Sequence, residues 1–174
     1  MTLKYGIAIF PSKPIQDEAN GYRKRYDPHY ALIPPHITLK EAFEADEQMI
    51  QELIPELKRI ANETKPFTIK INKVSTFAPV TNTIYFKVEP NETLQALHDK
   101  MHEGKFPKER QYNFVPHITI AQKLVEDEHS DVFGSLRMKK IALEDTVDRF
   151  QLMYQLDNQS WTVYETFVFG KEYV

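Results

Sequence analysis

Two copies of the tetrapeptide Pro-His-Ile-Thr carry the residues of this chain that are best suited to proton transfer. The first contains His36 and Thr38, and the second contains His117 and Thr119, 81 positions further on (117 − 36 = 81). Histidine has an unperturbed pKa of about 6.5, so two imidazoles can supply a proton acceptor and a proton donor near neutral pH. Threonine hydroxyls can donate hydrogen bonds to phosphate oxygens as negative charge grows on them. These four side chains therefore fit the cleavage or formation of a phosphodiester bond.

Each tetrapeptide lies in a short segment that predicts a β-strand, over residues 35–40 and 116–122. Alternate side chains of a strand share a face, so each histidine and the threonine two positions later point the same way. The apolar residues between them point into a core. The remaining histidines have no threonine two positions later; they are His29, His98, His102 and His129.

The rest of the chain predicts strands and helices in a repeated order. Further strands are expected near residues 4–10, 66–76, 82–89, 139–144, 147–156 and 161–169. Helices are expected near residues 13–24, 46–62, 91–102 and 127–136. Pro55 interrupts the second helix, where we expect a kink or two short helices.

Similar offsets within the two halves of the chain indicate an internal duplication. Ile7 precedes His36 by 29 residues (36 − 7), and Tyr85 precedes His117 by 32 (117 − 85). We therefore expect one α+β domain of two lobes, with repeat halves near residues 1–81 and 82–174. Each lobe is expected to be an antiparallel sheet flanked by helices, related to the other by a pseudo-twofold axis, with the active-site cleft between them.

Composition limits the classes of partner and site. The 174 residues carry a net charge of −3, which lacks the basic field of a protein that wraps duplex DNA but permits a local positive pocket for a small anion. The absence of cysteine excludes disulfides, cysteine-ligated zinc and cysteine nucleophiles. No motif has metal-ligand spacing, and no stretch approaches the ~18 apolar residues of a membrane span. We expect a cytoplasmic protein, a monomer, with no cofactor and no metal.

The segments His36-Ile37-Thr38-Leu39 and His117-Ile118-Thr119-Ile120 resemble the paired H-x-T-x signature of the 2H phosphoesterase superfamily. That superfamily includes 2′-5′ RNA ligase-like proteins and cyclic phosphodiesterases. The flanking text PPHITLKEAF and FVFGKEYV is similar to YjcG-type phosphoesterases of Bacillus-like bacteria. The resemblance implies a bilobal fold, metal-free catalysis, and substrates such as 2′,3′-cyclic phosphates or 2′-5′ linkages on RNA ends or nucleotides. It also implies that the histidines are the acid–base pair and that the threonines bind phosphate.

Basic and aromatic residues near the motifs are further candidates for substrate binding. Residues 22–30 and 105–114 combine both types, and they supply Arg25, Tyr30 and Tyr112 as contacts for a nucleotide. The alternative is solvated loop charge, with the aromatic rings partly in the core. Lys40 continues the face of the first motif and is either a phosphate contact or exposed to solvent.

Two rival functions remain open. One is a nucleotide-binding module that keeps the cleft but has little turnover, and the other is a histidine-based metal protein. An enzyme with two titrating imidazoles predicts a bell-shaped pH profile with apparent pKa values between about 5 and 8. The motifs recognise a phosphate and do not specify what is attached to it, nor whether the bond is hydrolysed or formed.

Overall fold

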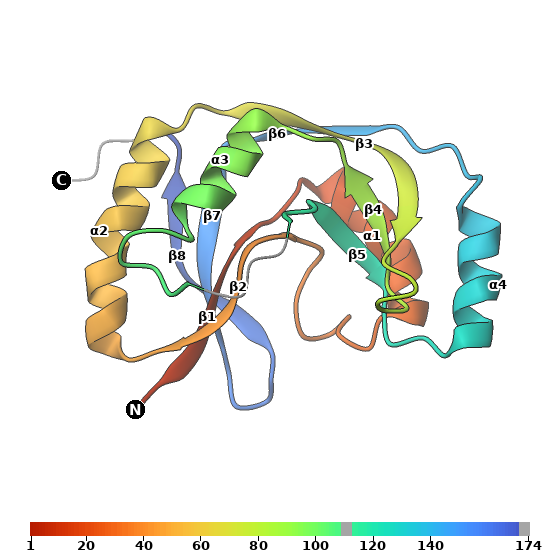
Figure 1. Cartoon of the computed structure of the whole chain (residues 1–174), viewed down its shortest axis with the longest axis horizontal. Helices are drawn as coiled ribbons and strands as arrows, with labels where there is room; N and C mark the ends of the chain where they lie inside the picture. The colour runs from red at the N-terminus through yellow and green to blue at the C-terminus, as the bar shows by residue number, and fades with distance from the viewer. Residues whose placement is uncertain (109–112, 171–174) are drawn as a thin grey trace.

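The computed structural model describes residues 1–108 and 113–170, and this part contains two layers of strands with helices around them (Figure 1). In chain order the elements are β1 (Leu3–Ile9), α1 (Lys13–Tyr26), β2 (Ile37–Ala45), α2 (Glu47–Glu63), β3 (Phe67–Thr76), β4 (Ile84–Val88), α3 (Glu92–Lys100), β5 (His117–Ala121), α4 (Glu126–Leu136), β6 (Leu143–Val147), β7 (Arg149–Gln155) and β8 (Trp161–Val168).

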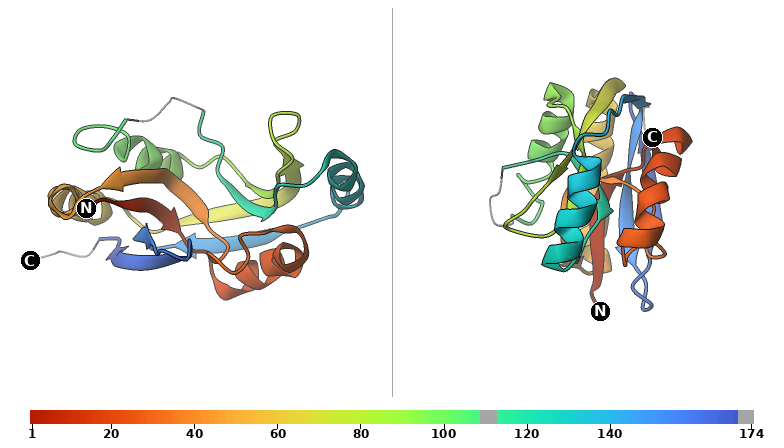
Figure 2. Two further views of the ribbon diagram at one scale, coloured as in Figure 1. Left: turned by 90° about the horizontal axis from the view of Figure 1, so that it is seen from below. Right: turned by 90° about the vertical axis from the view of Figure 1, so that its right-hand side faces the viewer.

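The strands form two four-stranded sheets in which every neighbouring pair is antiparallel. The first sheet has the order β2-β1-β7-β8, and the second has the order β5-β4-β3-β6. Figures 1 and 2 show α2 and α4 at opposite ends of the molecule. One cluster of buried apolar side chains includes residues of both sheets. The expected α+β architecture of two antiparallel sheets flanked by helices is confirmed.

The two sheets exchange strands between the two halves of the sequence. β3 leaves the first half to pair with β4, while β7 and β8 return to the sheet of β1. The helices also contact the sheet of the other half of the sequence, since α1 packs on β5 and α3 packs near β2. The division into residues 1–81 and 82–174 therefore does not coincide with the two sheets.

Helix ends follow the capping residues in the sequence. The side chain of Asp46 accepts from the Met49 amide at 2.8 Å, and that of Asn91 accepts from the Leu94 amide at 3.0 Å. α2 is one continuous helix of 17 residues, so the expectation of two short helices is wrong. Pro55 lies on its exposed face, where water can satisfy the carbonyl that lacks an amide partner.

No helix within residues 1–108 and 113–170 has both the length and the apolar character needed to cross a membrane.

Candidate active site

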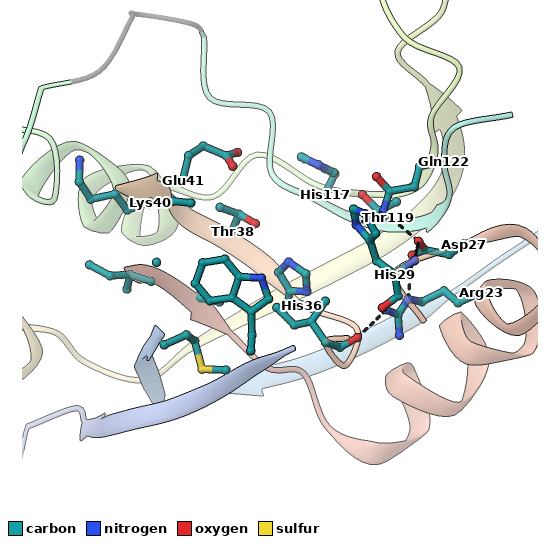
Figure 3. Close-up of a pocket in the computed structure, with 17 residues that line it drawn as sticks. Arg23, Asp27, His29, His36, Thr38, Lys40, Glu41, His117, Thr119 and Gln122 are labelled. Atoms are coloured by element: carbon teal, nitrogen blue, oxygen red, sulfur yellow. Dashed lines mark hydrogen bonds and ion pairs between the residues drawn. The ribbon is translucent and has the colours of Figure 1, made fainter. Parts of the chain in front are cut away.

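The two motifs meet in one cleft. His36 directly precedes β2, and His117 is the first residue of β5. β2 and β5 are edge strands of their sheets, and they contact each other where the sheets meet. A cleft of about 320 Å³ at this junction is lined by both histidines together with Thr38 and Thr119 (Figure 3). The structure thus brings together two His–Thr pairs that lie 81 positions apart in the sequence (117 − 36 = 81).

Backbone carbonyls fix the orientation of both motif histidines. Nδ1 of His36 lies 2.8 Å from the Pro34 carbonyl oxygen, and Nδ1 of His117 lies 2.6 Å from the Val115 carbonyl oxygen. A carbonyl oxygen only accepts, so each Nδ1 carries the hydrogen and each neutral ring keeps its lone pair on Nε2. The same contact to the residue two positions back occurs in both copies, across an intervening proline. Both rings are therefore set to exchange protons through Nε2.

Burial lowers the pKa of both motif histidines. Loss of hydration, and then the positive charge of Arg23, lowers the pKa of His36 to about 4, although its hydrogen bond to the Pro34 carbonyl opposes the shift. Loss of hydration also lowers the pKa of His117. An aromatic ring shields part of the second imidazole, since the centroid of Phe77 lies 4.9 Å from that of His117. Without a bound anion, both imidazoles are consequently neutral at pH 7.

A buried polar network forms the wall of the cleft beside His36. The Arg23 and Asp27 side chains are each 2% exposed and form an ion pair, with Nε 3.2 Å from Oδ2. Arg23 also donates to the Ile33 carbonyl at 2.5 Å, within the segment that leads to the first motif. Gln122, just after β5, donates through Nε2 to Oδ1 of Asp27 at 2.9 Å. The network therefore joins α1, the segment before His36 and the end of the second motif strand.

An apolar wall faces this network from the other strands of the first sheet. It includes Trp161 at the start of β8, whose amide donates to the Leu32 carbonyl at 2.8 Å. Gly6 and Met153 also line this wall, and they are paired across β1 and β7. A Cβ at Gly6 would lie 3.7 Å from the Trp161 indole, so glycine leaves the space beside the ring open. An aromatic face beside polar groups is suited to a nucleobase.

A sequence profile of the 2′-5′ RNA ligase superfamily matches residues 11–159, most of the chain and both motifs. The chain belongs to the 2′-5′ RNA ligase superfamily. Relatives in this superfamily are close in sequence. One from Oceanobacillus iheyensis is 67% identical over 170 residues, which is 98% of this chain and 100% of the relative. Another from a Geobacillus strain is 60% identical and covers 97% of each chain. Both relatives are provisionally named phosphoesterases.

Two solved structures share the fold of this chain. Escherichia coli LigT complexed with 3′-AMP has a TM-score of 0.72 and 17% identity, over 98% of this chain and 100% of LigT. The TT0787 protein of Thermus thermophilus has a TM-score of 0.73 and 19% identity over the same shares. The resemblance to the 2H phosphoesterase superfamily is confirmed by these matches.

Of the other predicted substrate contacts that the structure describes, only Lys40 lines the cleft. Lys40 lines the cleft but is only 1% exposed, and its Nζ donates to the Pro107 carbonyl at 2.7 Å. The alternative that this lysine is exposed to solvent is therefore wrong. Arg25 is exposed and does not line the cleft, because the helical turn directs Arg23 inward instead. Tyr30 is 44% exposed and lines a separate pocket. Tyr112 lies outside the described residues.

The sequence patterns indicate only part of this side of the cleft. Arg23 and His29 fall within residues 22–30, the basic and aromatic stretch in which nucleotide contacts are expected, and both line the cleft. Asp27 and Gln122 are missed, because Gln122 follows a strand end and the spacing of Asp27 from Arg23 on one helical face is equally typical of a surface ion pair. Trp161 is likewise brought in by strand pairing alone.

Proposed function

We propose that this protein is a phosphoesterase that acts on 2′-linked or 2′,3′-cyclic phosphodiesters of RNA ends or nucleotide derivatives, by metal-independent acid–base catalysis. The observation that carries the proposal is the pair of motif histidines, each with Nδ1 on a backbone carbonyl, in one cleft with two threonines. One chain supplies both pairs, so a monomer is sufficient for the reaction.

The proposed reaction needs two proton transfers at one phosphate. Nε2 of one neutral histidine accepts the proton of the attacking hydroxyl or water, whose oxygen forms a new bond to phosphorus. The other histidine, protonated beside the anionic phosphate, donates its Nε2 proton to the leaving oxygen as the second bond breaks. The Thr38 and Thr119 hydroxyls donate to the non-bridging oxygens. His36 and His117 exchange these roles when the reaction runs in reverse.

Family membership and the names of close relatives support phosphoesterase activity. LigT has been solved with 3′-AMP, with NADP+ and with ATP, so nucleotides bind that protein. In this chain the Trp161 wall beside the motif histidines offers a surface for the base of such a ligand. A small nucleotide or an RNA end is therefore the substrate class that we propose.

The deciding experiment is turnover of an oligonucleotide that ends in a 2′,3′-cyclic phosphate, measured with EDTA present. We expect His36→Ala and His117→Ala each to lower kcat/KM by about 10²-fold or more, because each removes one proton-transfer group. His98→Ala is the matched control, since His98 lies on α3 and does not line the cleft.

Equal turnover in the wild type and both motif variants would contradict the catalytic role. Loss of turnover on addition of EDTA, restored by a divalent cation, would contradict metal independence. Binding of 3′-AMP without turnover of any of the phosphodiesters would identify the binding module in place of the enzyme.

A further inference from the structure

A third histidine, His29, lines the cleft that holds His36 and His117. Figure 3 shows it on the side of the cleft where Asp27 and Gln122 lie. We propose that His29 is a phosphate-binding residue that presents a fixed Nε2–H donor to a non-bridging oxygen of the substrate. The proposal rests on the proposed function, since it assigns a further contact to the same phosphate.

The argument begins with the acceptors on Asp27. Its carboxylate takes a hydrogen bond from the His29 amide at 2.8 Å and is paired with the guanidinium of Arg23. A carboxylate that is ionised only accepts, so the atom of Gln122 that lies 2.9 Å from Oδ1 must be the amide nitrogen. The carboxylate thereby fixes which way the Gln122 amide points.

The orientation of Gln122 then fixes the tautomer of His29. The same Nε2 of Gln122 lies 3.2 Å from Nδ1 of His29. Because that nitrogen is a donor with two hydrogens, Nδ1 of a neutral His29 accepts, and its own hydrogen is on Nε2. His29 therefore has the opposite tautomer to the motif histidines, whose Nδ1 atoms donate to carbonyls.

This tautomer suits binding and not proton abstraction. Nε2–H of the neutral ring has no lone pair to take a proton, so it serves only as a donor. The non-bridging oxygens of a phosphodiester only accept, which makes them complementary to it. Among residues 1–108 and 113–170, the cations that line the cleft already have partners, because Arg23 is paired with Asp27 and Lys40 donates to the Pro107 carbonyl. Neutral donors therefore carry much of the contact with a phosphate.

The tautomer is measured directly by long-range ¹H–¹⁵N correlation spectra of the histidine rings at neutral pH. We expect the hydrogen on Nε2 for His29 and on Nδ1 for His36 and His117. A His29 ring with its hydrogen on Nδ1 would overturn the proposal, because no fixed donor would then face the cleft.

Two amide substitutions separate the donor role from a structural one. In His29→Asn the side-chain oxygen replaces Nδ1 and keeps an acceptor for Gln122, but the cleft donor is lost. In His29→Gln the amide nitrogen takes the place of Nε2 and restores a donor. The probes are 3′-AMP and adenosine, whose binding is followed by the fluorescence of Trp161, the only tryptophan of the chain and a residue of the cleft wall.

We expect His29→Asn to weaken 3′-AMP binding by about 10-fold or more, the size of a lost hydrogen bond to a charged group. His29→Gln should recover most of that loss, and adenosine affinity should stay unchanged in both variants. Equal weakening of 3′-AMP by both variants, or a parallel loss for adenosine, would make His29 a purely structural residue and overturn the proposal. These affinities do not depend on turnover, so a failure of the acid–base proposal is recognised separately by the His36→Ala and His117→Ala rates.

Discussion

At the scale of single residues, the cleft controls its histidines through the atoms that contact Nδ1. Carbonyl oxygens set the hydrogen of His36 and His117 on Nδ1, and burial then lowers the pKa of both rings. An anionic phosphate between them has the opposite effect, since it favours a protonated imidazole. Substrate binding therefore creates the proton donor that the free protein lacks at neutral pH.

The pH dependence of catalysis follows from these shifts. With His36 near a pKa of about 4 and His117 also below 6.5, kcat/KM should reach its maximum on the acidic side of pH 6.5. Above that maximum the rate falls because the donor imidazole of the free protein has lost its proton. The maximum of kcat should lie at higher pH, because bound phosphate raises the pKa values of both His36 and His117. This maximum lies at lower pH than the sequence alone predicts, since two unperturbed imidazoles predict apparent pKa values between about 5 and 8.

Steady-state rates from pH 3.5 to 8.5 on a 2′,3′-cyclic phosphate check this prediction, with folding at each pH confirmed by circular dichroism. A kcat/KM profile that is flat over this range, or that rises steadily to pH 8.5, would contradict it.

At the scale of elements, α1 has two ion pairs with the same spacing but different surroundings. Lys13 and Asp17 are 83% and 62% exposed, whereas Arg23 and Asp27 are each 2% exposed. The exposed pair contributes little because water competes for both charges. Arg23 of the buried pair also donates to the Ile33 carbonyl, so this pair holds in place the segment that leads to His36.

Removing one carboxylate from each pair tests this difference. Asp27→Ala should lower the free energy of unfolding by about 3–5 kcal/mol, because it leaves a buried guanidinium without its partner. Asp17→Ala is the matched control and should cost less than about 1 kcal/mol. Urea denaturation of both variants gives the comparison, and similar losses in the two would contradict the assigned role of the buried pair.

Pro55 gives a second test at this scale. Pro55→Ala should raise the free energy of unfolding by about 1–2 kcal/mol, since alanine restores a helical amide at an exposed position, partly offset by the greater freedom of the unfolded chain. α2 supplies no residue to the cleft lining, so turnover should stay unchanged. A less stable variant would show that packing of Ile54 and Leu57 needs the proline.

At the scale of the whole molecule, the sequence predicts what is local or repeated. The helix caps at Asp46 and Asn91 are short-range patterns that the structure confirms, and both motif strands form, although the first spans Ile37–Ala45 and so begins after His36. The expectation of a duplication also predicted that His36 and His117 share one cleft, and both line it. Strand pairing is not local, so the exchange of β3 and β7 between sheets has no signature in the sequence. The wall residue Trp161 was not predicted for the same reason, since only strand pairing brings it to the cleft.

The strand exchange also sets when the cleft can form as the chain is made. β1 ends at Ile9 and its sheet neighbour β7 begins at Arg149, so 139 residues (148 − 9) must be added between them. At typical elongation rates this takes roughly 7–28 s. During that interval β1 and β2 have only each other as partners, although His36 has already emerged. A nascent chain that stopped after β5 would contain both motifs but only two strands of the sheet that supports the first, so the cleft is completed only once β7 and β8 have been made.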